Sequence, residues 1–167
     1  MENSKNEKEN SVKKLKEKYE IFQKKYSLPE FEEMNKIFAI EKADPDSELL
    51  LREIIHFIAD KFQNYMRFLE NLINPANSSM FAFSLMKLMD NGKRMQLSDI
   101  YKKISEIEIK LIKLDLKPDE NSEADFIKDS YKLWNEINVE LFEIIDSAEK
   151  NFSTTQNSEE IKKGYFG

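Results

Sequence analysis

Glycine is scarce in this sequence, and its scarcity limits the fold class. Only three glycines occur among the 167 residues, and each of the four prolines stands where a helix is expected to begin or end. Two-residue hairpin turns depend largely on glycine, so we expect an all-α protein. Residues 1–91 contain no glycine, which excludes the glycine-rich phosphate loops of nucleotide-binding folds.

Cysteine is absent and histidine occurs once. The lack of cysteine excludes disulfides, thiolate metal sites and thiol nucleophiles, and a single histidine argues against a catalytic triad. No apolar run approaches the roughly 18 residues that a membrane-spanning helix needs, and the first residues lack the apolar core of a signal peptide. We therefore expect a cytoplasmic protein with no catalytic residue, cofactor, metal or transmembrane segment.

Negative charge is concentrated near the C-terminus. The chain has a net charge of −6, and residues 117–150 alone contain ten acids and four lysines, which leaves the remainder neutral. This acidic surplus argues against a nucleic-acid surface on the last helix. It favours a basic protein partner, or serves only to keep the protein soluble.

The central prediction is one long helix over residues 46–74. Apolar residues recur there at steps of three and four, which is the spacing of one helix face. A second stripe, which includes Glu53 and His56, is entirely polar, and we expect it to face solvent. Asp44 and Pro45 are expected to start this helix, and Pro75 to end it.

The other helices follow from similar patterns. Ser27 and Glu30 match a capping box that would open a short helix, and Asn91-Gly92 is typical of a helix end. On the next helix Ile109, Ile112 and Leu116 form a second apolar stripe, so we expect that part to be covered on two sides. A pair, Ser122 and Asp125, is expected to cap the last helix. The expected helices cover residues 11–26, 30–38, 46–74, 80–90, 97–116 and 123–150.

Together these helices predict an antiparallel bundle of about four core helices with two additional N-terminal helices, because short connections favour antiparallel neighbours. We expect a single helical domain over residues 11–152. Residues 1–10 are expected to be a disordered tail and residues 153–167 a flexible one.

Two sets of polar residues have spacings that are known from catalytic or metal sites. Glu53 and His56 have the glutamate–histidine spacing of di-iron bundles, but no second histidine exists and the pair lies on the polar stripe, which favours a solvated histidine. Three glutamates share one face of the last helix, where paired acids can transfer protons only inside a cleft. We expect that face to be a solvated, acidic interaction surface. Its residues are Glu136, Glu140 and Glu143.

Lysines and aromatic residues alternate in the N-terminal helix, which is a weak sign of nucleic-acid binding. Glutamates on the same helix are placed to pair with these lysines, so an ordinary amphipathic helix is the simpler interpretation. The lysines are Lys13, Lys14, Lys16, Lys18, Lys24 and Lys25.

The segment from Met80 to Met89 is the strongest candidate for a binding surface. Eight of its ten residues are apolar and they point all around a helix, which favours burial in the protein's own core. Methionines and phenylalanines also suit adaptable interfaces, so a protein contact or a membrane-surface contact is an alternative. The interaction candidates here are Met80, Phe83, Met86 and Met89.

No stretch carries a motif specific enough to indicate a family. The sequence therefore favours a non-enzymatic protein–protein interaction or assembly module, whose partner is another protein or a second copy in a homodimer. One alternative is a nucleic-acid or ribosome-associated factor that uses the lysine-rich N-terminal helix. A further alternative is a bundle enzyme with an interior carboxylate site.

Overall fold

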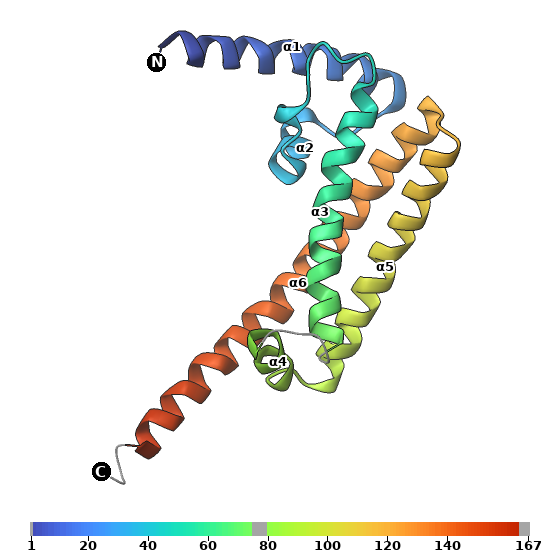
Figure 1. The fold of residues 1–167 in the computed structure, drawn as a ribbon. Coiled ribbons are helices and arrows are strands. Elements are labelled where there is room, and N and C mark those ends of the chain that lie inside the picture. The colour runs from blue at the N-terminus through green and yellow to red at the C-terminus, as the bar shows by residue number, and fades with distance from the viewer. Residues whose placement is uncertain (1, 75–79, 164–167) are drawn as a thin grey trace. The chain divides into compact units, whose positions relative to one another are not determined.

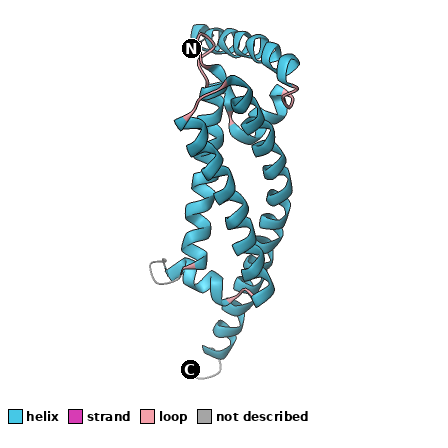
Figure 2. Cartoon of the chain, turned by 90° about the vertical axis from the view of Figure 1, so that its right-hand side faces the viewer, coloured by secondary structure: helices cyan, strands magenta, loops and turns pink. Residues whose placement is uncertain are grey.

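The chain is helical throughout the part that the structure, a computed structural model, describes, namely residues 2–74 and 80–163. Six α-helices and a short 3-10 helix form there, and no strand occurs among these residues (Figure 2). The all-α prediction is therefore confirmed. The elements are α1 (Glu2–Tyr26), α2 (Phe31–Phe38), η1 (Ile40–Lys42), α3 (Leu50–Ile73), α4 (Met80–Lys87), α5 (Asn91–Leu116) and α6 (Glu120–Lys163) (Figure 1).

The contacts gather into two compact units, and the long helices α3, α5 and α6 contribute residues to both. Helix extends into both segments that were expected to be tails, since α1 begins at Glu2 and α6 ends at Lys163. The division of the chain into one domain and two tails stays a prediction. Unit 1 comprises Met1–Gln63 and Glu106–Leu133, and unit 2 comprises Asn64–Ser105 and Trp134–Gly167.

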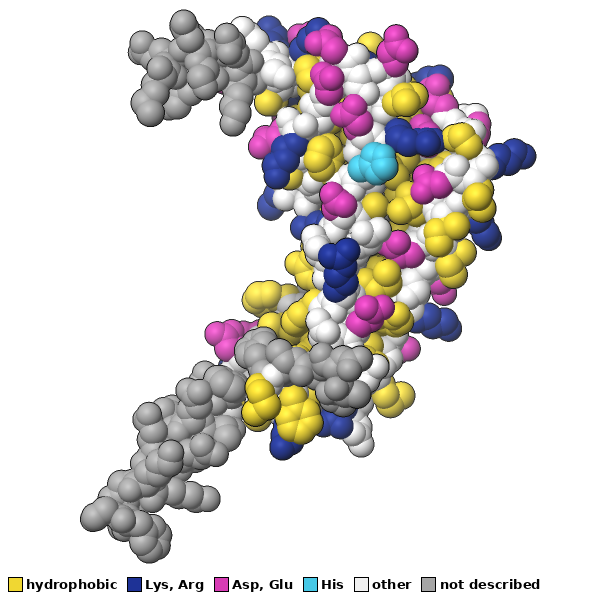
Figure 3. Space-filling view, in the orientation of Figure 1, with side chains coloured by type: hydrophobic (Ala, Val, Ile, Leu, Met, Phe, Trp, Pro, Cys, Tyr) yellow, Lys and Arg dark blue, Asp and Glu magenta, His cyan; other side chains and the backbone are white. Residues whose placement is uncertain are grey.

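Helix α3 has one buried and one exposed side, as its periodicity predicts. Leu51, Ile54 and Ile58 on the apolar side are buried. His56 on the polar side is exposed, and it lies at the surface in Figure 3. The prediction of a solvated histidine is therefore confirmed.

The core of unit 1 brings α1 and α2 together with α3 through aromatic side chains. Tyr19 is fully buried, and its hydroxyl donates a hydrogen bond of 2.7 Å to the Pro29 carbonyl. Its ring meets Phe31 edge-on, with 5.6 Å between centroids. The rings of Phe38 and Phe62 lie 6.3 Å apart. These contacts anchor α2 against both of its neighbours.

A largely enclosed ion pair joins the first turn of α3 to the first turn of α6 in unit 1. The Arg52 Nε and Nη2 atoms donate to Glu123 Oε1 at 3.0 and 2.6 Å. The Glu123 side chain is only 12% exposed, so its carboxylate is largely shielded from water.

Unit 2 contains the only tryptophan of the chain. Trp134 is buried on α6, and its ring meets Tyr65 of α3 edge-on with 5.1 Å between centroids. Further along α6 the Ser147 hydroxyl accepts a hydrogen bond from Lys93, and Asn151 Nδ2 donates to the Leu88 carbonyl at 3.2 Å.

The start of α3 differs from the prediction. The helix begins at Leu50, whereas residues 46–49 lie in turns. The Asp44 carboxylate accepts a hydrogen bond from the Asp46 backbone N–H at 2.9 Å. Aspartate side chains that bond to a nearby backbone group compete with helix formation, so Asp44 stabilises a turn instead of capping the helix.

The expected capping box at Ser27 is also wrong. Ser27 has a φ of 55°, and the Leu28 N–H donates to the Gln23 carbonyl at 3.2 Å. A left-handed residue with such a bond is a common way to end a helix, so Ser27 terminates α1. Glu30 is the N-cap of α2 and makes no side-chain cap bond.

Asn91 and Gly92 begin α5 and do not end the helix before it. The Asp90 carboxylate accepts a hydrogen bond from the Lys93 backbone N–H at 2.9 Å, which is the geometry of an N-cap. Gly92 has no positive φ. The expected helix end is therefore wrong, because Asp90 caps a helix that begins at Asn91.

Asp119, rather than the expected Ser122 and Asp125, caps α6. Its carboxylate accepts hydrogen bonds from the Ser122 hydroxyl at 2.7 Å and from the Ser122 backbone N–H at 2.9 Å. These bonds hold the pKa of Asp119 below its ordinary value. The helix consequently starts at Glu120, three residues before the predicted position.

Glu108 on α5 is a half-buried carboxylate of unit 1, and its Oε1 atom is buried without a hydrogen-bond partner in the described structure. Burial raises the pKa of Glu108, and a hydrogen bond with Gln63 partly opposes that shift. A raised folded-state pKa means that stability falls as pH rises from the unfolded-state value, about 4.3, through the folded-state value.

We therefore expect Glu108→Gln to raise the melting temperature at pH 7, and to raise it less at pH 4, where the carboxyl group is already largely protonated. Thermal unfolding followed by circular dichroism at both pH values measures this. Glu106→Gln is the control, because Glu106 is exposed on the same helix. An equal gain in melting temperature at both pH values would contradict the conclusion that burial raises the pKa of Glu108.

Candidate interaction surfaces

The methionine-rich segment is divided between surface and core. Helix α4 ends at Lys87, three residues before the predicted end. Met80 is 82% exposed and Phe83 is also exposed, whereas Met89 is only 3% exposed and Met86 is half-buried. Burial on most sides is therefore wrong for the start of this segment. Met80 and Phe83 are available to a partner, but Met89 belongs to the core of unit 2.

The three glutamates of the predicted acidic surface lie on the outer side of α6. Glu136 and Glu143 are exposed and Glu140 is partly exposed. The Lys103 ammonium pairs with Glu136 at 2.6 Å. The hydrogen bond that ties α6 to the end of the methionine-rich segment lies further along the helix, at Asn151.

Two exposed apolar residues on α6 were missed from the sequence. Val139 and Phe142 are 57% and 71% exposed, and each is followed directly by a glutamate, Glu140 or Glu143. Residues three and four apart share a helix face, so both lie outside the inward stripe. Plotting that stripe on a helical wheel would have revealed them. We call Val139 and Phe142, with Glu136, Glu140 and Glu143, the α6 patch.

A second apolar surface lies on the outer side of α5 in unit 1. Ile109, Ile112 and Leu116 are 53–80% exposed, so the expectation that this part of α5 is covered on two sides is wrong. The opposite side of the helix, at Ile107 and Leu114, is buried. One face of α5 therefore meets the core and the other faces solvent. We call the exposed residues, with Lys110, Lys113 and Lys117, the α5 stripe.

The lysines of α1 are engaged mainly by other parts of unit 1. Lys14 pairs with Asp46, and Lys16 pairs with Glu32, whose carboxylate raises the pKa of Lys16. The Lys25 ammonium lies 2.8 Å from Glu120. Lys18 donates to the backbone carbonyl of Ser47. Three of the six lysines are thus paired with carboxylates, which reduces the positive charge available to a nucleic acid.

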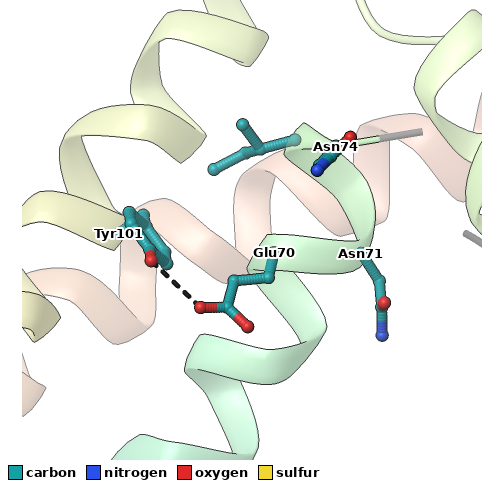
Figure 4. A pocket seen from close by; sticks show the side chains of 5 residues that line it. Glu70, Asn71, Asn74 and Tyr101 are labelled. Carbon is teal, nitrogen blue, oxygen red and sulfur yellow. Dashed lines mark hydrogen bonds between the residues drawn. The ribbon is translucent and has the colours of Figure 1, made fainter. Parts of the chain in front are cut away.

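The pocket in Figure 4 is a polar hollow in unit 2, with a volume of about 410 Å³. Its wall includes Glu70, Asn71 and Asn74 from the end of α3, and Tyr101 from α5. The Tyr101 hydroxyl donates to Glu70 at 3.0 Å, and this bond raises the pKa of Tyr101. In this wall the Tyr101 phenol therefore acts as a hydrogen-bond donor to Glu70.

The glutamate–histidine pair on α3 is not gathered into a ligand set. Glu53 accepts a hydrogen bond from the Asp44 backbone N–H at 2.8 Å, and His56 is exposed. Among the residues that the structure describes, no group of three or more histidine, cysteine, aspartate or glutamate side chains is placed to hold a metal ion. None of the described helices combines the length and apolar character that a membrane crossing requires.

Comparison of the chain with family models, with curated proteins and with solved structures finds no match.

Proposed function

We propose that the protein is a non-enzymatic helical module that binds another protein through the outer face of α5. The observation that carries this proposal is the exposure of Ile109, Ile112 and Leu116 at helical spacing. Contiguous exposed apolar side chains, unlike scattered ones, mark interaction sites. A stripe with this spacing suits docking of one helix face onto another or into a groove.

Two features favour this proposal over the alternative functions. Three of the six α1 lysines that would bind a nucleic acid, Lys14, Lys16 and Lys25, are paired with carboxylates of the same unit. Glu108 is half-buried, and among the described residues no group of three or more histidine, cysteine, aspartate or glutamate side chains is placed to hold a metal ion. Catalysis by paired carboxylates needs two acids held close together in different environments.

We also propose that the core helices form the antiparallel bundle expected from the sequence. Pairs within unit 2 support this arrangement. Glu70 meets Tyr101, whereas the earlier Met66 meets the later Ser105, which supports opposite directions for α3 and α5. Lys103 pairs with Glu136, and the earlier Lys93 pairs with the later Ser147, as expected for antiparallel α5 and α6.

A photo-crosslinking amino acid at position 112 tests the proposed function in cells that naturally produce the protein. We expect a covalent adduct with a defined protein, identified by mass spectrometry, because position 112 lies in the middle of the stripe. Position 121 is the matched control, since Asn121 is exposed in the same unit but outside the stripe. Equal adduct yields at both positions would contradict the proposal.

A further inference from the structure

The α5 stripe and the α6 patch have the same layout and opposite charge. In the α5 stripe each apolar residue is followed by a lysine, as in Ile112-Lys113 and Leu116-Lys117. On α6 each is followed by a glutamate, as in Phe142-Glu143. Consecutive helical residues differ by about 100° around the axis. Each surface therefore carries its charge on the same rotational side of its apolar ridge.

This layout determines how two such surfaces can meet. Each apolar ridge has two flanks, one formed by the residues that follow the apolar positions and one by the residues that precede them. When two such helices pack in antiparallel directions, the following residues of one helix meet the following residues of the other. In parallel packing, the following residues of one helix meet the preceding residues of the other. Antiparallel docking therefore places Lys113 and Lys117 of the α5 stripe against the glutamates of the α6 patch, whereas Lys110 already pairs with Asp129 of its own chain. Parallel docking would place those glutamates against Glu108 and Asp115, the residues that precede Ile109 and Leu116. Such like-charge contacts oppose binding.

We propose that the partner of the α5 stripe is the α6 patch of a second copy of this chain, docked antiparallel. This inference rests on the proposed function and names its partner. The two surfaces also match in length, since residues 109–116 and 136–143 each extend about 10 Å along a helix. The contact lies between two copies and pairs different surfaces, so it is heterologous.

The contact is small and its expected affinity is modest. Interfaces of this size give weak complexes, with dissociation constants of roughly 10–100 µM. The full-length chain has a mass of 19.8 kDa. In sedimentation equilibrium its weight-average mass is expected to rise above that value as concentration increases through this range. A constant monomer mass up to 500 µM would overturn the inference.

Substitutions on either surface test which residues make the contact. Ile112→Asp and Phe142→Asp are each expected to abolish self-association while leaving the helical circular dichroism spectrum unchanged, because both side chains are exposed. A mixture of the two variants is expected to form a heterodimer, since each retains the surface that the other has lost. Ile21→Asp is the control, because Ile21 is an exposed apolar residue on α1.

Charge reversal tests the antiparallel pairing. Lys113→Glu and Glu143→Lys are each expected to raise the dissociation constant about tenfold, and the double variant is expected to recover most of the affinity. If the double variant binds more weakly than either single variant, the antiparallel pairing is wrong.

The remaining outcomes separate this inference from the proposed function. If Ile112→Asp abolishes association but Phe142→Asp does not, the stripe pairs with another surface and the α6 patch is not its partner. A crosslink from position 112 to a different protein, with a monomeric chain in solution, supports the proposed function and overturns this inference. The absence of both a crosslink and self-association contradicts both.

Discussion

Replacement of Phe62 by alanine is expected to lower the free energy of unfolding by about 4 kcal/mol, the largest effect of any single substitution considered for this chain. Phe62 is fully buried on α3 in unit 1, and its ring faces Phe38 of α2. Truncation removes the transfer free energy of the ring and leaves a cavity that neighbouring side chains fill only in part. Urea unfolding followed by circular dichroism measures the loss.

Phe142→Ala is the matched control for this prediction. It deletes the same atoms from an exposed position, and the expected change is within about 0.5 kcal/mol. Both measurements belong at low micromolar concentration, where association does not contribute. Equal losses of unfolding free energy for the two variants would contradict the burial of Phe62, and therefore also the packing of α2 on α3.

Glu123→Ala is expected to destabilise the protein by about 2–3 kcal/mol. The substitution leaves the Arg52 guanidinium partly enclosed without the carboxylate that accepts its two hydrogen bonds. The value lies below the range for fully buried pairs because the Arg52 side chain retains some access to solvent. Chemical denaturation at pH 7 gives the difference.

Controls for this pair separate the loss of a partner from the loss of the charges themselves. Replacing both Arg52 and Glu123 with methionine is expected to cost less than Glu123→Ala, because no unpaired charge remains. Glu120→Ala breaks the exposed pair with Lys25, and exposed pairs contribute little. If Glu120→Ala destabilises the protein as strongly as Glu123→Ala, enclosure is not what gives the Arg52 pair its strength.

The features predicted correctly from the sequence are those that a local pattern encodes directly. Apolar spacing along residues 46–74 identifies both the helix and its buried side, including the exposed position of His56. The scarcity of glycine, which predicts the helical class, can also be read directly from the sequence. The 3.6-residue repeat of an α-helix can be recognised without knowing which elements pack against it.

Features that depend on competing or distant partners were predicted less well. Asp44, Asp90 and Asp119 can each cap a helix or hold a turn, and neighbouring backbone groups decide between these roles. On α5 both apolar stripes have helical spacing, and only the packing of other helices decides that Leu114 is buried and Ile112 exposed. The sequence therefore identifies the apolar residues of the α5 stripe, but their exposure, and with it their role as an interaction candidate, could not be predicted.

The position of the single indole gives this protein a local optical reporter. Trp134 and its partner Tyr65 both lie in unit 2, and unit 1 contains no tryptophan. Intrinsic fluorescence therefore follows the loss of unit 2, whereas the far-ultraviolet signal follows helices in both units. Coincident transitions would indicate cooperative unfolding of the whole chain. A fluorescence transition that precedes the helical one would identify unit 2 as the part that opens first.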